Sequence, residues 1–143
     1  MNVAAFQRIG DRLTLALLSG DFALYRSLIA LPMTITPRNG ETYILHDEAA
    51  LREDFDLYHN MLAVSGVTDV FRDVLDVDQS VADKAIVRVM THIMVNALRV
   101  SDPFETRFFL VGAGGHWAIR EIESSAEHID WTLGKASPAF GWV

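Results

Sequence analysis

Cysteine is missing from all 143 residues of this chain. Without a thiol, the protein has no disulfide, no cysteine nucleophile and no cysteine-ligated metal site. Long apolar runs are missing too, since no stretch approaches the roughly 18 apolar residues of a membrane span. Arg8, Asp11 and Arg12 interrupt the only apolar pattern near the N-terminus, so the sequence predicts no signal peptide. We therefore expect a cytoplasmic protein that has no membrane partner.

Basic residues are also scarce. The chain has 12 Lys plus Arg against 19 Asp plus Glu, a net charge of −7, and its basic residues form no stripe. This balance argues against nucleic acid as a partner. The five histidines show neither i, i+4 nor HExxH spacing, so we expect no metal ion. The glycine-rich run 112–115 joins two strands and opens no helix, so it is no phosphate cradle, and we expect no cofactor.

What the sequence does contain is a series of helix and strand patterns. Apolar residues at helical spacing predict three helices, at 3–18, 21–29 and 48–64. Gly20, Asp21 and Asp47 suit the helix caps, and Pro32 is expected to end the second helix. The Asn39-Gly40 turn predicts a hairpin of two short strands, at 33–37 and 42–45. Longer strands are expected at 67–77, 84–99, 104–112 and 116–123.

These elements predict a single α+β domain over residues 1–143, with a core at about 3–123. The tail, 124–143, is less regular but holds Trp131, Phe140 and Trp142. Three large aromatic side chains favour a tail that packs on the body of the protein or on a partner subunit. The strand at 67–77 and the residue after it carry four acids: Asp69, Asp73, Asp76 and Asp78. They are expected to form a solvated sheet edge, although Asp73 could point inward.

The two faces of the last three strands can be sorted from the short turns near 101–102 and 112–115. Each loop is expected to contain an even number of residues. The first loop then places Val95 opposite Phe108, and the second places Ile119 opposite Phe108 on its other side. Side chains alternate along each strand. The face assigned to the helices then contains Val87, Val89, Thr91, Ile93, Val95, Ala97, Phe104, Thr106, Phe108, Leu110, Trp117, Ile119, Glu121 and Glu123. The opposite, outer face contains Arg88, Met90, His92, Met94, Asn96, Arg107, Phe109, Val111, His116, Ala118, Arg120 and Ile122.

The outer face is too apolar to be left in water on a monomer. The sequence therefore predicts an isologous homodimer through this face. His92 and His116 are expected to lie close together there, both beside Val111. Their protonation is then expected to weaken the dimer at mildly acid pH.

The order of elements resembles the nuclear transport factor 2-like superfamily, in its SnoaL-like branch. The resemblance covers about residues 3–123 and rests on Gly20-Asp21-Phe22 with Tyr25 and Pro32, the helix at 48–64, Asp83–Val87 and Gly115–Ile122. It implies a cone-shaped, curved mixed or antiparallel sheet wrapped around three helices. It also implies a pocket at the wide end and dimers formed through the sheet. Members include isomerases, dehydratases, cyclases and ligand binders, and the catalytic members use Asp, His or Tyr in the pocket.

Candidate site residues follow from the face assignment. Glu121 beside Thr106 would be a general acid or base if it is buried in an apolar pocket, although a position at the sheet rim is the more common arrangement. Tyr25 and Tyr58 lie on apolar helix stripes, where they could stabilise an oxyanion or, more commonly, only pack in the core. The remaining candidate ligand contacts are Thr91, Thr106, Phe108, Trp117, Phe55 and His59.

Three functions fit these features. An apolar lining favours binding of a small apolar or cyclic molecule. The same pocket could serve a cofactor-independent isomerase, cyclase or dehydratase, with Glu121 as acid or base and Tyr25 or Tyr58 as the oxyanion donor. A dimerisation module would instead have its cavity filled by its own side chains. The sequence does not decide whether the protein is an enzyme.

Overall fold

The computed structural model describes residues 1–37, 40–99, 102–113 and 115–125. Within these residues it has three helices: α1 (Val3–Ser19), α2 (Phe22–Ser27) and α3 (Glu48–Val64). The Asp21 and Asp47 side chains cap α2 and α3 by accepting backbone N–H bonds from Leu24 and Ala50. The predicted aromatic tail lies mostly outside the described residues.

The turn between α1 and α2 requires a glycine. Gly20 has a φ of 73° and ends α1 in the left-handed conformation. A Cβ at this position would also lie 2.8 Å from His59 Nε2, on α3. The predicted cap is therefore confirmed, and the same residue lets α3 approach the end of α1.

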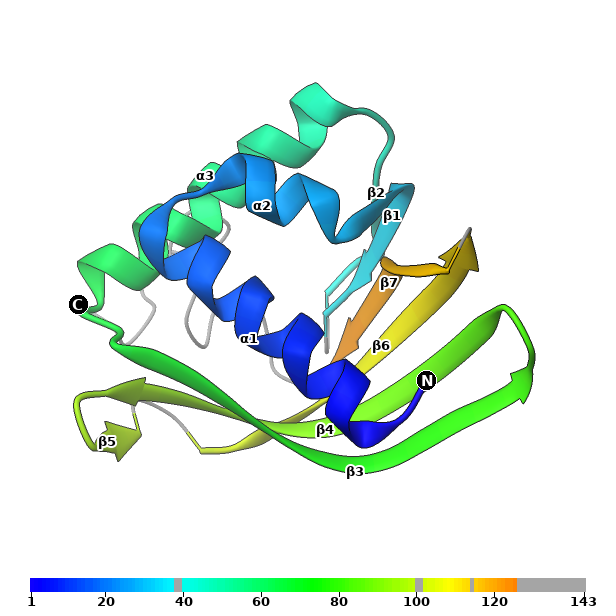
Figure 1. Ribbon diagram of the computed structural model, residues 1–143. Helices are drawn as coiled ribbons and strands as arrows, with labels where there is room; N and C mark the ends of the chain where they lie inside the picture. The colour runs from blue at the N-terminus through cyan, green and yellow to red at the C-terminus, as the bar shows by residue number, and fades with distance from the viewer. Residues whose placement is uncertain (38–39, 100–101, 114, 126–143) are drawn as a thin grey trace.

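Seven strands form one sheet: β1 (Ile29–Thr36), β2 (Tyr43–Leu45), β3 (Asp69–Val81), β4 (Lys84–Val95), β5 (Leu98–Arg99), β6 (Phe104–Ala113) and β7 (His116–Ser124). The strand order is β2-β1-β7-β6-β4-β3, and β5 pairs only with β4. The β1–β7 pair is parallel and the other pairs are antiparallel, which makes the sheet mixed. The sheet curls around the three helices, as Figure 1 shows. This is the α+β cone that the sequence predicts.

Several element boundaries differ from the predictions. Strand β1 begins at Ile29, where a start at 33 is predicted, and β3 extends to Val81, beyond the predicted end at 77. Helix α2 ends at Ser27, and Pro32 lies inside β1, so Pro32 does not end the helix. Strand β4 ends at Val95, where Asn96 adopts a φ of 55° and starts a tight turn into β5. Left-handed asparagine is well suited to such a turn. The predicted single strand at 84–99 is therefore a strand followed by a small hairpin.

This hairpin shifts the pairing of β4 with β6. Val87, instead of the predicted Val95, lies opposite Phe108. The shift is eight residues, an even number, so each side chain stays on its predicted face. Consistent with this, the inner face contains fully buried residues of β4, β6 and β7: Val87, Val89, Ile93, Phe108, Leu110 and Ile119. All of them except Ile93 pack with Phe6, Leu13, Ala16, Leu51 and Phe55 of the helices to form the core.

A β-bulge in β7 reverses the predicted faces beyond Ile119. Leu110 pairs with Ile119, but its neighbour Phe109 pairs with Glu121, so Arg120 is the extra residue of the bulge. Ile122 consequently pairs with Phe108 and shares the inner face with it. Glu121 points to the outer face. The prediction that Glu121 and Glu123 face the helices and that Ile122 faces outward is wrong for this reason.

No helix in the described part of the chain is both long enough and apolar enough to cross a membrane.

Candidate functional site: a cavity between the helices and the inner face of the sheet

A cavity of about 120 Å³ lies between the helices and the inner face of the sheet. All three helices and five of the strands contribute to its wall, which is mostly apolar. The apolar residues are Leu13, Leu17, Ile35, Pro37, Leu62, Val70, Ile93, Phe104, Phe108 and Ile122. The polar residues are Tyr25, Asp54, Tyr58, Arg72, Thr91, Thr106 and Ser124. An apolar chamber with a few polar groups is the usual form of a small-molecule site.

Asp54 places a carboxyl group in this wall. It lies on the inner side of α3, one turn before Tyr58, and only 5% of its surface is exposed. The Tyr43 hydroxyl donates to Asp54 Oδ1 at 3.4 Å. Tyr58 in turn donates to the Tyr43 hydroxyl. Two phenols and one acid therefore form a hydrogen-bonded chain from the cavity wall to β2.

Burial and the nearby Asp54 keep these phenols protonated. Burial is the largest cause that raises the pKa of Tyr43 and Tyr58 above its usual range, and the Asp54 charge adds to it. Both hydroxyls are therefore hydrogen-bond donors throughout the physiological pH range.

Tyr25 contributes a third phenol, from α2. Its ring packs on Phe55 with the centroids 4.8 Å apart, and the residue is 6% exposed. Burial, followed by the charge of Asp54, raises its pKa above the usual range. Among the described residues, its hydroxyl has no hydrogen-bond partner. A buried phenol without a protein partner is uncommon, and here it lines the cavity.

Arg72 places a buried guanidinium in the wall from β3. Its exposed fraction is 8%, and Nη1 donates to the Gly10 carbonyl at 3.0 Å and to Thr14 Oγ1 at 2.6 Å. The guanidinium also lies 5.9 Å from the centre of the Phe108 ring. Burial lowers its pKa to about 10, while Asp11 and Asp69 act in the opposite direction. Arg72 is therefore still a cation at neutral pH, and no described carboxylate forms an ion pair with it.

Five of the predicted site residues line the cavity: Tyr25, Tyr58, Thr91, Thr106 and Phe108. Thr91 and Thr106 share a buried hydrogen bond of 3.0 Å across β4 and β6. This bond gives each hydroxyl one hydrogen-bond partner, and it links the two strands in the cavity wall. Their contact with a ligand stays a prediction.

Four predicted site residues do not line the cavity: Glu121, Phe55, His59 and Trp117. The bulge turns Glu121 to the outer face. Phe55 is buried beneath Tyr25, and His59 Nδ1 lies 2.6 Å from the Leu17 carbonyl oxygen, at the end of α1. Trp117 lines a separate groove beside α1.

The sequence analysis missed Asp54 and Arg72, although each leaves a pattern. Asp54 falls on the apolar stripe of α3, between Leu51 and Tyr58, where a charged residue is unusual. Arg72 alternates with Val70 and Val74 on β3, so it shares their inward face. By the same alternation Asp73 points outward, and the idea that it could point inward is wrong. The other three acids of the predicted edge are also exposed, on a strand at the sheet edge.

The centre of the outer face is polar, and Arg88 and Arg107 lie there as predicted. Arg88 and Arg107 both bond Glu105, at 3.0 and 3.6 Å, and Arg107 also reaches Glu123 at 3.6 Å. Apolar side chains lie on either side of this row, among them Ile86 and Phe109 towards one end and Phe71 and Met94 towards the other.

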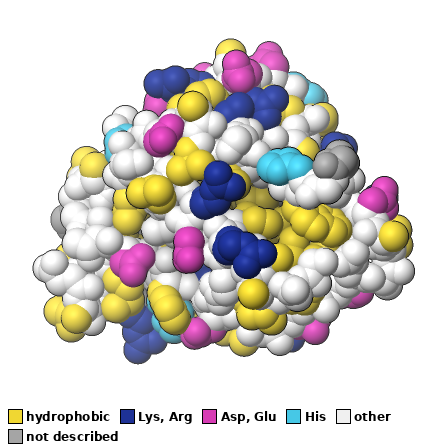
Figure 2. Space-filling model, in the orientation of Figure 1, with side chains coloured by type: hydrophobic (Ala, Val, Ile, Leu, Met, Phe, Trp, Pro, Cys, Tyr) yellow, Lys and Arg dark blue, Asp and Glu magenta, His cyan; other side chains and the backbone are white. Residues whose placement is uncertain are grey.

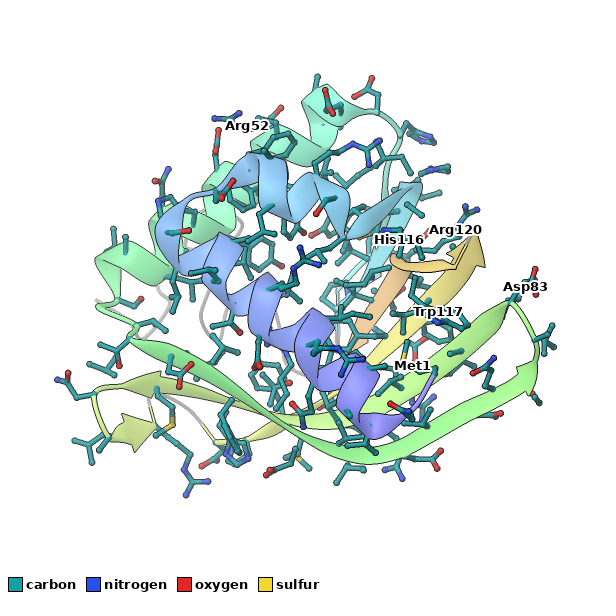
Figure 3. The ribbon with its side chains drawn as sticks, in the orientation of Figure 1. Met1, Arg52, Asp83, His116, Trp117 and Arg120 are labelled. Carbon is teal, nitrogen blue, oxygen red and sulfur yellow. The ribbon has the colours of Figure 1, made fainter. Side chains whose placement is uncertain are left out.

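His92 and His116 are not neighbours, contrary to the prediction. The eight-residue shift pairs Val111 with Lys84, away from His92. His92 pairs with Phe71 of β3, and its Nε2 lies 3.1 Å from Asp73 Oδ2. His116 Nε2 instead lies 3.1 Å from the Ser27 carbonyl oxygen, at the end of α2. Figure 3 labels His116 at the start of β7. With Trp117, Arg8 and Arg12 it lines the groove beside α1, where basic side chains border an apolar recess (Figure 2). His116 therefore lies outside the outer-face patch.

No group of three or more potential metal ligands is found among the residues that the structure describes. The polar groups of the cavity wall are one carboxylate, phenols, hydroxyls and a guanidinium. The guanidinium is a cation and therefore repels metal ions. The chemistry that this set supports is therefore hydrogen bonding and proton transfer.

The fold and the cavity define a class of protein: a curved sheet closed over helices, with a mostly apolar cavity between them. No family model and no curated protein matches the sequence. Solved structures do match the fold. A nuclear transport factor 2-like protein of unknown function from Shewanella oneidensis superposes with a TM-score of 0.66 at 12% identity, over 87% of this chain and 99% of that protein.

Two further matches have names that suggest activities. A candidate ketosteroid isomerase from Shewanella frigidimarina has a TM-score of 0.62 and 17% identity, over 82% of this chain and 92% of its own. A candidate dehydratase of the same structural family from Streptomyces avermitilis has a TM-score of 0.63 and 13% identity, over 87% and 94%. The chain thus has the nuclear transport factor 2-like fold, which confirms the predicted fold. The SnoaL-like branch stays a prediction.

Proposed function

We propose that this protein binds a small apolar or cyclic molecule in the cavity between its helices and the inner face of the sheet. The observation that carries the proposal is the cavity itself, because a dimerisation module with a filled cone would have no such chamber. Its lining is mainly apolar, and its polar groups can orient a ligand.

The cavity volume limits the size of the ligand. A chamber of about 120 Å³ is comparable to engineered cavities of roughly 150 Å³ that accept benzene. The ligand is therefore of single-ring size. Larger polycyclic compounds would need the wall to open.

A matched pair of variants on β4 tests the proposal. Ile93 lines the cavity and is 2% exposed, whereas Ile86 faces outward and is 39% exposed. The thermal midpoint of each variant is measured with toluene, phenol and cyclohexanone. We expect at least one compound to stabilise the wild type and Ile86→Phe, and none to stabilise Ile93→Phe. Equal stabilisation of both variants, or no stabilisation of the wild type, would contradict the proposal.

Proton transfer on the ligand is the second candidate function, and the Asp54–Tyr43–Tyr58 chain favours it. In this scheme Asp54 replaces Glu121 as the general base. The Asp54 carboxylate accepts a proton from the carbon beside a ligand carbonyl, and the C–H electron pair forms an enolate. The Tyr25 hydroxyl donates a hydrogen bond to the enolate oxygen. Returning the proton to another carbon completes an isomerisation.

Deuterium exchange of cyclohexanone in D₂O, followed by NMR, tests this second function. We expect the wild type to accelerate exchange beside the carbonyl and Asp54→Asn to slow it by about 10²-fold or more. Asp56→Asn is the control, because Asp56 is on the same helix but exposed and paired with Arg52. If all three proteins exchange equally, Asp54 is no base.

We also propose a homodimer through the outer face, involving Met90, His92, Met94, Phe109 and Val111. The apolar side chains that flank the row of ion pairs support it, since Phe71 is 55% exposed and Ile86 39%. Sedimentation should show a dimer that Phe109→Lys dissociates and Val81→Lys, at the tip of the β3–β4 hairpin, does not. A wild-type monomer would rule out this interface. A dimer unchanged between pH 5.5 and 7.5 would exclude His92 as a pH switch.

A further inference from the structure

The guanidinium of Arg72 is the unusual feature of the cavity wall. Taking a charged group out of water costs several kcal/mol unless an opposite charge or good hydrogen bonds offset it. Arg72 is 8% exposed, and its bonds to Gly10 and Thr14 both come from Nη1. Within the described residues, neither Nη2 nor Nε has a hydrogen-bond partner and no carboxylate pairs with the group. Part of its donor fork is therefore available to a ligand.

Asp54 does not balance this charge. The acids that act on the pKa of Arg72 are Asp11 and Asp69, both exposed, and Asp54 is not one of them. Asp54 instead interacts with the tyrosines. The cation and the acid thus occupy separate parts of the same chamber, and the Arg72 part lacks a counter-charge.

We propose that the ligand is a carboxylate of single-ring size, whose anionic group binds Arg72 and whose ring fills the apolar part of the cavity. This inference rests on the proposed binding function and specifies the ligand class. A planar guanidinium matches a carboxylate through paired N–H bonds. The Nη1 bonds to Gly10 and Thr14 hold the fork in one orientation before the ligand arrives. This preorganisation reduces the entropy cost of binding.

Charge and size favour a carboxylate over a phosphate. Arg72 is the only cation of the described cavity wall, so it neutralises one negative charge. A doubly charged phosphate would keep one uncompensated charge in a chamber that also holds Asp54. Tyr25 supplies a second donor, because its buried hydroxyl has no partner in the described chain. A second acceptor on the ring, such as a carbonyl or hydroxyl oxygen, would satisfy it.

Calorimetric titration of benzoate and benzamide at pH 7 tests the inference, because the two differ in charge and hardly in shape. We expect the wild type to bind benzoate more tightly by about tenfold or more, as charge-assisted bonds are about twice as strong as neutral ones. In Arg72→Met, benzoate should lose this advantage, while benzamide affinity changes by less than about threefold. Arg72→Lys keeps the charge without the fork and should retain a reduced preference for benzoate.

The outcomes separate this inference from the binding function. If the wild type binds benzamide as tightly as benzoate, or if Arg72→Met keeps the preference, the carboxylate assignment is wrong and the cavity still binds ligands. If neither compound binds, the single-ring binding function fails, and the inference fails with it. Should Arg72→Met not fold, the comparison of the wild type with Arg72→Lys decides.

Discussion

Asp54 and Arg72 are both buried charges in one cavity, yet their surroundings differ. Asp54 accepts a hydrogen bond from Tyr43, which itself accepts one from Tyr58. Arg72 bonds only neutral oxygens, and through one nitrogen. Buried charges are normally paired or fully hydrogen-bonded. The protein thus provides hydrogen-bond partners for its buried acid from its own side chains, whereas its buried cation keeps N–H groups that a ligand could bind.

Removing the acid should have the largest effect on stability. Asp54→Ala removes the carboxylate that accepts the Tyr43 hydroxyl bond, and we expect a loss of about 2–3 kcal/mol in the free energy of unfolding. Asp54→Asn keeps an acceptor oxygen and should lose about 1 kcal/mol. Urea unfolding measures both. Equal losses in the two variants would show that the hydrogen bond to Tyr43 contributes little.

Alkaline pH should act on the three phenols and on Arg72 in opposite directions. The folded-state pKa values of Tyr25, Tyr43 and Tyr58 are raised, so their contribution is fully present below the unfolded-state pKa of about 10 and falls as the pH rises further. Each contributes a slope of up to about 1.4 kcal/mol per pH unit. The pKa of Arg72 is lowered, so its burial cost is present at neutral pH and diminishes above about 10.

Tyr25→Phe isolates one of these contributions. We expect the variant to lose stability less steeply than the wild type between pH 9.5 and 11, as measured by urea unfolding at each pH. A control, Tyr25→Leu, removes the same ionisation together with the ring packing on Phe55. It should match the shallower slope at lower stability. An unchanged slope in Tyr25→Phe would contradict the buried position of this phenol.

Replacing the cation should have a smaller effect, of the opposite sign. Arg72→Met removes a buried charge that has no ion pair and fills similar volume. We expect stability to rise by about 1 kcal/mol, because apolar replacements of buried charges are often stabilising. A loss of more than about 2 kcal/mol would show that the bonds to Gly10 and Thr14 outweigh the desolvation cost, and that Arg72 is chiefly structural.

The smallest effect is expected at Glu121. Because the bulge directs it to the outer face, Glu121→Gln should change both ligand affinity and stability by less than about 0.5 kcal/mol. Titration and urea unfolding of this variant measure the two quantities. A large loss of ligand affinity would mean that Glu121 reaches the cavity and that the β7 register is wrong.

The sequence predicted the fold because its signals are local and periodic. Helix α3 was bounded correctly from Asp47 onward, and even loops assigned Val87 and Phe108 to the inner face. The pairing partner of Phe108 was wrong, because the Asn96 turn has no strong signal and leaves the alternation unchanged. A shift in register by an even number of residues keeps each side chain on the same face of the sheet but changes the residue it pairs with.

The candidate site was harder to predict. A single extra residue, Arg120, turns Glu121 to the outer face and Ile122 to the inner face. No residue type in the sequence predicts such a bulge. Asp54 and Arg72 were overlooked because each interrupts a stripe of apolar residues by only one position. Asp54 is bonded by Tyr43 of β2, and Arg72 bonds Gly10 of α1, so both partners come from other elements of the fold. Such contacts become visible only in three dimensions.

We propose above that a ligand of single-ring size enters the chamber on the inner face of the sheet. Methyl NMR during titration with benzoate tests it directly, because both faces of β4 carry isoleucine. We expect saturable shifts for the methyl groups of Ile93 and Leu62, which line the cavity, and none for the outward-facing Ile86. Shifts at Ile86 without shifts at Ile93 and Leu62 would contradict it.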